Sequence, residues 1–420
     1  MSNSYRALLL WIVVSLLMVL HFFMILSIGV MTSALRNDLR LTALELSFLS
    51  SSYLYIYLLM QTPAGILLDN FGARKLLTIG ALVCSLGCWA FAHSSSLTIA
   101  ILSRVLMGGG LTFVFISSVQ LASRWFPKRY FSMMIGFSEA SGMFGAIVGN
   151  MLLAIYLNQI GWRHSFALAG AVALILSLLS FIFIRDYPNK DAVPVRSRLT
   201  VAKVMINLRI LTRMSLIWLH SSYISLMYVS VTVFSGLWAN PFLRRAFNMN
   251  LEQSTLACCL VLAGIGIGSP IAGALCATNK SRNICIQSSA LIMCVLMCAL
   301  IYIPYLNHAM INLLMFCLGL SGSGIILSFA IVSDIAPEGA KSTSVGLTNT
   351  ISLITAILFQ PIIGWILNLL SSELNSKGLE YYTATHYRIA LSVLPLLLLA
   401  AFFVGVVIAR KSKHHQLKAN

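Results

Sequence analysis

The residues best suited to chemistry in this chain are ionisable side chains inside long apolar stretches, and Arg104 is the first of them. A charge at such depth is costly unless it faces a cavity or an internal partner, so it often marks a pathway for a solute or an ion. We interpret Arg104 as a cavity-facing group that binds substrate or couples a proton. The alternative is a side chain that extends outward to the near end of its helix.

Glu139 and His21 also lie deep inside apolar stretches. A carboxyl group in a low-dielectric environment favours its neutral form, which makes Glu139 a candidate proton carrier. A structural carboxyl group bonded to nearby hydroxyl groups fits the sequence equally well. His21 is a candidate contact for a proton or the substrate, although a lone histidine on an apolar helix is more often a packed residue.

Other polar side chains occur at regular spacing. Tyr53, Tyr57 and Gln61 recur every four residues, which places three polar tips on one helix face. Tyrosines also serve as anchors at the membrane surface, so this interpretation stays open beside the functional one. The residues that we add to the substrate or proton site are Gln61, His220, Tyr223 and Tyr228.

The sequence contains no arrangement that would support catalysis or hold a cofactor. No carboxylate pair or set of Ser, His and Asp gathers at one depth, and no phosphate-binding loop is present. Cys84 and Cys88 are one helical turn apart, but no histidine or carboxylate within the run 76–92 completes a metal site. We therefore predict no enzyme activity, catalytic residue, cofactor or metal, and no pump driven directly by ATP.

The composition of the whole chain indicates its environment. Hydrophobic residues make up 59% of the 420 residues and charged residues 9%, whereas about a quarter of a soluble protein is charged. A chain this apolar cannot cover a globule with polar surface, so lipid must surround it. The net charge of +17 then reflects basic residues on the cytoplasmic side of a membrane and not a nucleic-acid partner.

Membrane-spanning helices are the elements that must position these residues. About 20 apolar residues cross the hydrocarbon as a helix, and the apolar runs are continuous, unlike the alternating strands of a barrel. Most of the 28 Lys and Arg residues fall on one side when successive loops alternate, which predicts cytoplasmic N and C termini. The twelve expected spans are 7–34, 44–68, 76–92, 97–123, 130–157, 165–184, 214–239, 253–276, 283–303, 308–333, 342–368 and 388–409.

The spans divide into two similar halves. The spacing from Gly65 to Arg74 recurs between Gly273 and Arg282, in the loop at the same topological place. Duplicated halves are typical of transporters that bind substrate between repeats. The predicted domains are a six-helix bundle over 1–184, a cytoplasmic central loop over 185–213, and a second six-helix bundle with a basic cytoplasmic tail over 214–420.

The central loop is the longest cytoplasmic connection and is strongly basic. It opens with Asp186-Tyr187-Pro188-Asn189, which predicts a solvated linker. Its part Leu199–Ile210 is expected to form a short amphipathic surface helix. Such a helix either binds acidic lipid headgroups or carries the positive charge that anchors a cytoplasmic loop.

The segment Gly65–Lys75 resembles the signature loop between helices two and three of the major facilitator superfamily of secondary transporters. The resemblance implies a latch of charge-assisted contacts that holds one conformation at the cytoplasmic face. A plain helix hairpin with basic residues is the alternative. In the second copy Ala277 replaces the aspartate and Lys280 replaces the second glycine, so a latch there should be weaker. The implied latch residues are Gly65, Asp69, Gly72, Arg74, Lys75 and Arg282.

Glycines near the polar residues are predicted to let helices pack closely. The stretch from Arg104 to Gly110 resembles the helix-four motif of the same superfamily, whose arginine is associated with substrate or proton coupling. Glycines in the span 130–157 resemble a motif of exporters, with Ala146 and Asn150 as departures from it. The glycines that we assign to helix packing are Gly108, Gly110, Gly145 and Gly149.

We predict a secondary transporter that moves a small organic solute by alternating access, as a proton-coupled symporter. Arg104, His21 and His220 outnumber Glu139, which favours an organic anion such as a carboxylate metabolite or a carboxylate siderophore. A drug or siderophore efflux antiporter, with a cation beside Glu139, is the alternative. A channel is disfavoured because filter segments and charge rings are absent from the sequence. We expect a monomer in the bacterial inner membrane that contacts solute, protons and lipid but not nucleic acid.

Overall fold

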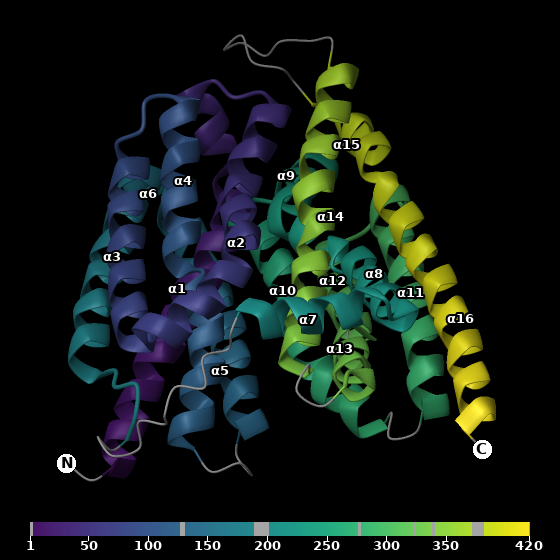
Figure 1. Cartoon of the computed structure of the whole chain (residues 1–420). Coiled ribbons are helices and arrows are strands. Elements are labelled where there is room, and N and C mark those ends of the chain that lie inside the picture. Colours follow the sequence, from purple (N-terminus) through teal and green to yellow (C-terminus); the bar gives the residue numbers. More distant parts are fainter. Residues whose placement is uncertain are drawn as a thin grey trace. The chain divides into compact units, whose positions relative to one another are not determined.

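The computed structural model describes residues 3–126, 131–188, 201–275, 279–322, 324–337, 341–371 and 382–419. Every regular element in these ranges is a helix (Figure 1). Hydrocarbon offers no partner for main-chain N–H and C=O groups, so an apolar chain must pair them internally, and helices do so. The chain forms two compact units. Unit 1 comprises Met1–Leu41 and Phe48–Val201, and unit 2 comprises Thr42–Ser47 and Ala202–Asn420.

Unit 1 is built around α6, against which α1 and α3 pack, and α3 also packs against α4. The first residues of α2, up to Ser47, belong to unit 2. The helices are α1 (Asn3–Leu39), α2 (Ala43–Phe71), α3 (Ala73–Ala92), α4 (Leu97–Leu111), α5 (Phe113–Trp125) and α6 (Phe131–Phe183).

Unit 2 contains the remaining helices, among which α10 packs against α12, α11 against α16, and α8 against both α14 and α16. A π-helical segment, η3, continues α8. The elements are α7 (Val201–Thr212), α8 (Ser215–Met227), η3 (Ser230–Trp238), α9 (Ala239–Ala246), α10 (Leu251–Leu275), α11 (Asn279–Tyr302), α12 (His308–Ser321), α13 (Gly324–Ile335), α14 (Lys341–Leu370), α15 (Ala384–Leu391) and α16 (Val393–Ala419).

Eleven stretches in the described ranges are long and apolar enough to cross a membrane. One of them, Ala140–Phe183, includes Gly161, whose φ of 72° and ψ of 166° interrupt α6. Glycine adopts this left-handed backbone without the steric cost of a side chain. The predicted spans 130–157 and 165–184 fall on either side of this break. The count of twelve crossings and the cytoplasmic termini stay predictions.

Polar side chains start several helices by accepting a main-chain N–H that has no partner within the helix. The Ser96 hydroxyl accepts from the N–H of Ile99 at 3.4 Å, where α4 begins. The Asn307 amide oxygen accepts from the N–H of Met310 at 2.8 Å, where α12 begins. These caps fix where the apolar runs become helical.

Glycines allow main chains to approach closely at matching places in the two units. A Cβ atom on Gly108 would collide with the main-chain oxygen of Tyr53, and one on Gly319 would collide with that of Val261. The two pairs are separated by nearly the same interval as the repeated loops, so the internal repeat extends to helix packing. The other three predicted packing glycines also lie in close contact: Gly110 against the Gly80 carbonyl, Gly145 against Val19 and Gly149 against Phe23.

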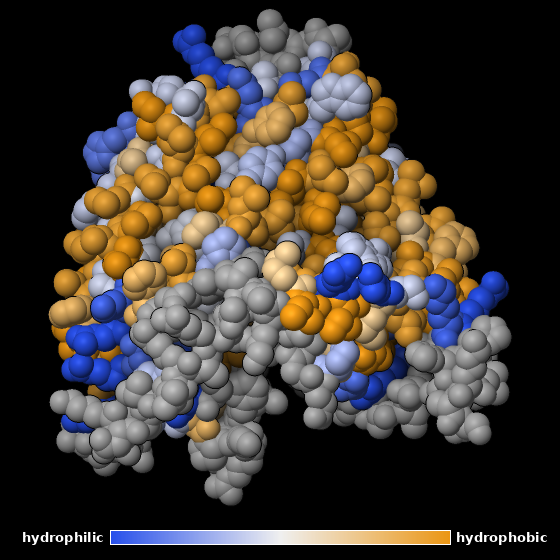
Figure 2. Space-filling view, viewed as in Figure 1, coloured by the Kyte–Doolittle hydropathy of each residue, from blue (hydrophilic) through white to orange (hydrophobic). Residues whose placement is uncertain are grey.

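Large apolar side chains cover the outside of the helices. Figure 2 shows hydrophobic residues over much of the middle of the visible face. Leu59, Phe144, Leu168 and Phe403 are each more than half exposed. A soluble monomer rarely exposes this much apolar surface to water, whereas lipid solvates such a surface.

Candidate functional site

Arg104 is fully buried in unit 1 and is bound to two other helices. Its Nη1 donates a hydrogen bond of 2.6 Å to the main-chain oxygen of Met24 on α1. Its guanidinium carbon lies 5.0 Å from the centre of the Tyr53 ring on α2, a cation–π arrangement. The side chain therefore points into the helix bundle, and the alternative of an arginine extended toward the end of its helix is excluded.

One edge of the Arg104 guanidinium has no bound group among the residues that the structure describes. Nε and Nη2 are both buried, and neither has a hydrogen-bond partner within the described part of the chain. These two nitrogens, which we call the open edge of Arg104, form a planar fork. A carboxylate matches such a fork with two parallel hydrogen bonds. Leaving charged donors buried without partners is costly, so the arrangement favours an anionic ligand.

Tyr53 connects Arg104 to His21. The Tyr53 hydroxyl lies 2.7 Å from Nδ1 of His21, and both side chains are buried. The His21 ring also stacks on Tyr57, with 4.9 Å between ring centres. The spacing predicts that the tyrosines share one helix face, but Tyr53 is not among the site residues expected from the sequence. The position of Tyr53 one turn before Tyr57 is the sequence feature that could have indicated its place in the site.

The local sequence explains why these groups meet. His21 and Met24 are one turn apart on α1 and so present to the same side. Gly108 is one turn after Arg104 on α4, and its missing side chain lets α4 approach the Tyr53 carbonyl.

The side chain of Gln61, further along α2, is partly buried, and its Nε2 has no hydrogen-bond partner among the described residues. The side chain of Glu139 lies outside the described residues.

The candidates in unit 2 make mainly structural contacts. The Tyr223 hydroxyl donates to the Ile286 main-chain oxygen at 2.8 Å and so links α8 to α11. The Tyr228 main-chain oxygen accepts from the Thr232 hydroxyl at 2.9 Å. His220 is buried, and its Nδ1 has no partner in the described ranges. The hydrogen bonds of Tyr223 and Tyr228 therefore connect groups within unit 2.

The predicted latch loop contacts the segment that follows α6. Gly72 has a φ of 82°, and a Cβ atom there would collide with the Asp186 carboxylate. The Arg74 main-chain N–H donates to Oδ1 of Asp186 at 3.2 Å, and its Nε donates to the Phe181 main-chain oxygen at 2.9 Å. Asp186, at the start of the expected linker, is therefore held by this loop. The Asp69 side chain lies outside the described residues.

The end of α5 holds the same segment from another side. Nη1 of Arg124 donates to the Asp186 main-chain oxygen at 3.5 Å, and its guanidinium lies 4.4 Å from the Tyr187 ring centre. Asp186 and Arg124 belong to this contact but are not among the latch residues expected from the sequence. Of the other predicted latch residues, Lys75 is exposed, Gly65 has open space around it, and Arg282 pairs with Asp334 at 3.1 Å.

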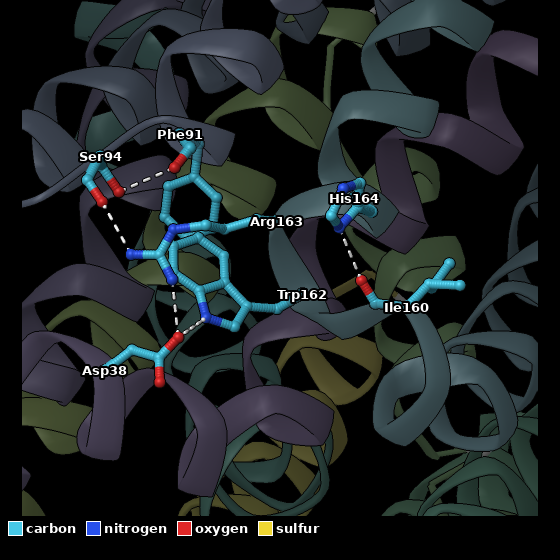
Figure 3. A network of polar contacts seen from close by, with 7 residues as sticks. All are labelled: Asp38, Phe91, Ser94, Ile160, Trp162, Arg163 and His164. Carbon is cyan, nitrogen blue, oxygen red and sulfur yellow. Dashed lines mark hydrogen bonds and ion pairs between the residues drawn. The ribbon is translucent and has the colours of Figure 1, made fainter.

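A second polar network lies where α1 and α3 end and where Gly161 interrupts α6, and Figure 3 shows its residues. Oδ2 of Asp38 accepts from Nε1 of Trp162 at 2.8 Å and from Nη1 of Arg163 at 2.6 Å. Arg163 also donates to the Ser94 main-chain oxygen at 3.2 Å. The backbone break at Gly161 directs Trp162 and Arg163 toward α1, so this network stabilises the C-terminal ends of α1 and α3 against α6.

The apolar helices and the buried arginine define a multi-pass integral membrane protein with a polar site inside its first unit. The family model of the Major Facilitator Superfamily matches residues 14–360. This chain belongs to that superfamily, and it is therefore a membrane transporter.

Two curated relatives and one solved structure are similar to the chain. The probable sulfoacetate transporter SauU of Cupriavidus necator is 25% identical, over 40% of this chain and 39% of that protein. The probable galactarate/D-glucarate transporter GudP of Escherichia coli is 22% identical, over 90% of this chain and 91% of that protein. A bacterial homologue of the human lysosomal transporter Spinster, solved in an inward-facing conformation, aligns with a TM-score of 0.78 at 15% identity over 98% of both chains.

Proposed function

We propose that this chain transports a small organic anion across the bacterial inner membrane by alternating access, in symport with protons. The observation that carries the proposal is the open edge of Arg104. A buried guanidinium with one nitrogen bonded to a carbonyl and two adjacent nitrogens available is suited to a carboxylate.

Physical chemistry favours an anion over a neutral or cationic solute at this place. A bound carboxylate would neutralise the guanidinium and pair two buried donors at once. A neutral hydroxyl group would pair them without neutralising the charge, and a cation would be repelled. Because water is scarce in such an environment, the electrostatic attraction is stronger than at a surface.

The names of the relatives support an acidic solute. Sulfoacetate, galactarate and D-glucarate each carry two acidic groups, so all are anions at neutral pH. The alignment with SauU covers less than half of that protein, and GudP is only 22% identical. We therefore take from them the chemical class, a small acid with more than one polar group, and not the individual substrate.

Proton coupling would let a cell accumulate the anion against its own negative interior. His21 is a candidate carrier because it lies within the same cluster as Arg104. Glu139 is the second candidate, as the sequence indicates. A latch that includes Arg74 and Asp186 would hold unit 1 in one of its conformations during the transport cycle.

The proposal is tested by ligand binding to purified protein followed by transport in proteoliposomes. We expect D-glucarate, D-galactarate or sulfoacetate to raise the melting temperature, since a ligand stabilises the state that it binds, and neutral D-xylose to leave it unchanged. Preloading the vesicles with the same anion should accelerate its entry, as a carrier requires. In Arg104→Ala this binding should be lost, whereas Arg209→Ala, which removes an exposed arginine, should bind normally.

Stabilisation by D-xylose or by an organic cation, but by none of the acids, would contradict the proposal. So would unchanged binding of an acid to Arg104→Ala. Entry that does not respond to preloaded anion would indicate a channel instead of a carrier.

A further inference from the structure

Tyr53 is in contact with both ionisable groups of the unit 1 site. Its hydroxyl oxygen is within hydrogen-bond distance of Nδ1 of His21, and its ring face supports the Arg104 guanidinium. The side chain is fully buried. A phenylalanine would pack equally well at this position, so the hydroxyl group needs a reason beyond packing.

The hydrogen bond between Tyr53 and His21 can run in two directions. A neutral histidine whose proton is on Nε2 accepts from the tyrosine hydroxyl at Nδ1. A protonated histidine carries hydrogen on both nitrogens, so its Nδ1 must donate and the tyrosine oxygen must accept. Proton uptake therefore frees the hydroxyl hydrogen of Tyr53 for another acceptor.

We propose that Tyr53 is a positioning residue that couples proton uptake at His21 to anion binding at Arg104. This inference rests on the proposed function. When His21 takes up a proton, the released hydroxyl of Tyr53 donates to the anion that Arg104 holds. The anion then has donors from two helices, α2 and α4, and binds more tightly than to neutral His21.

Charge acts in the same direction. A protonated His21 and Arg104 would be two cations in one buried cluster, and they would repel each other while the open edge of Arg104 has no anion. A bound anion removes this repulsion. By linkage, the anion must then favour proton uptake by the same factor by which the proton favours anion binding. Anion and proton would therefore enter the site together.

The other titratable groups described around the cluster do not supply this switch. Tyr57 faces His21 from α2, and the thiols of Cys84 and Cys88 are buried on α3. Phenols and thiols ordinarily titrate above about pH 8. On α5, Arg124 is held by Asp186 and Tyr187.

The part of α6 beside His21 presents small residues to α1. Gly142 lies against Phe22, the residue after His21. Glu139 is one turn before Gly142, and its side chain is outside the described residues. Variants of Tyr53 leave Glu139 unchanged. A pH dependence that these variants remove therefore does not come from Glu139.

The test is calorimetric titration of the purified full-length protein with sodium D-glucarate at pH 5.5 and pH 7.5. In the parent we expect binding to tighten by about fivefold or more at the lower pH, a typical size for coupling between two sites. Tyr53→Phe keeps the ring under Arg104 but lacks the hydroxyl. Its affinity should change far less between pH 7.5 and pH 5.5 than that of the parent.

Two further variants make the result specific. Tyr57→Phe removes the hydroxyl of the neighbouring tyrosine that stacks on His21 and should behave as the parent. His21→Asn keeps a polar group near the position of Nδ1 but cannot take up a proton, so it should also lose the tightening. It replaces Tyr53→Phe as the decisive variant if the latter does not fold.

The outcomes separate the two proposals. Equal tightening in the parent, Tyr53→Phe and His21→Asn would overturn the coupling, and so would a parent whose affinity does not change with pH. In both cases loss of binding in Arg104→Ala would still support anion transport. A parent that binds no organic acid would overturn the proposed function and this inference with it.

Discussion

Gly108 contacts the main-chain oxygen of Tyr53 at a place where any Cβ atom would collide. Arg104 precedes this glycine by one helical turn, and its guanidinium lies on the ring of the same tyrosine. One residue without a side chain thus sets the distance between α2 and α4, and with it the position of the buried cation.

Gly108→Ala should therefore destabilise the protein and weaken the site. Forcing a methyl group into a packed contact costs about 1–3 kcal/mol, which should appear as a lower melting temperature of the purified protein. Gly109→Ala is the matched control, because a Cβ atom there would be 3.6 Å from Ile56, an ordinary contact. Equal melting temperatures for the two variants would mean that α4 shifts without cost.

Arg104→Lys should bind an acidic substrate more weakly although it keeps the charge. An ammonium group cannot form the two parallel hydrogen bonds of a guanidinium edge. Loss of one charge-assisted hydrogen bond costs about 1.5–3 kcal/mol, so affinity should fall roughly tenfold or more. Calorimetry with one identified acid measures this. Tighter binding in Arg104→Ala than in the parent would instead indicate a cationic substrate.

Asp69→Asn should slow transport while leaving membrane insertion intact, since it removes one charge near the end of α2 and not from the middle of a span. Asp334→Asn alters the pair with Arg282 in unit 2. It should slow transport less, because the second copy of the loop lacks the aspartate and the second glycine of the first copy. Initial uptake rates at matched expression give the comparison. A parental rate for Asp69→Asn would rule out the latch.

Glu139→Gln should abolish uphill accumulation and preserve exchange if this carboxyl group carries the coupled proton. Exchange of one anion for another does not require the proton to be released. Uphill uptake and exchange are measured in the same proteoliposomes, with and without a pH gradient. Accumulation that persists would remove Glu139 from the mechanism, and loss of both activities would assign it to folding or binding.

Trp162→Phe should lower stability modestly. The variant keeps a ring beside Phe91, whose centre is 5.2 Å from that of Trp162, but loses the hydrogen bond to Asp38. A single hydrogen bond contributes about 1 kcal/mol. Trp365→Phe is the control, because Trp365 is 53% exposed on the outside of α14. Thermal unfolding in detergent should show a lower melting temperature for Trp162→Phe and an unchanged one for Trp365→Phe.

The sequence alone determined the class of this protein. Charged residues are so rare, and apolar runs so long, that only membrane helices satisfy the main chain, and the basic residues indicated an orientation. The Gly65–Lys75 segment identified the superfamily. Arg104, His21 and Gln61 could be selected because polar groups are conspicuous inside apolar helices. The break at Gly161 appeared only as a gap between two expected spans.

Tertiary structure decided which of these residues meet. A helix that is apolar on every side has no polar stripe to show which face is turned inward, so its sequence does not fix the rotation about its axis. For this reason the contact of Tyr53 with both His21 and Arg104 could not be derived from spacing. The contact of Asp186 with Gly72 joins residues far apart in the chain. It depends on how the end of α6 lies beside the connection from α2 to α3. The open edge of Arg104 is a property of the packed helices, because it exists only where neighbouring side chains leave two of its nitrogens without partners.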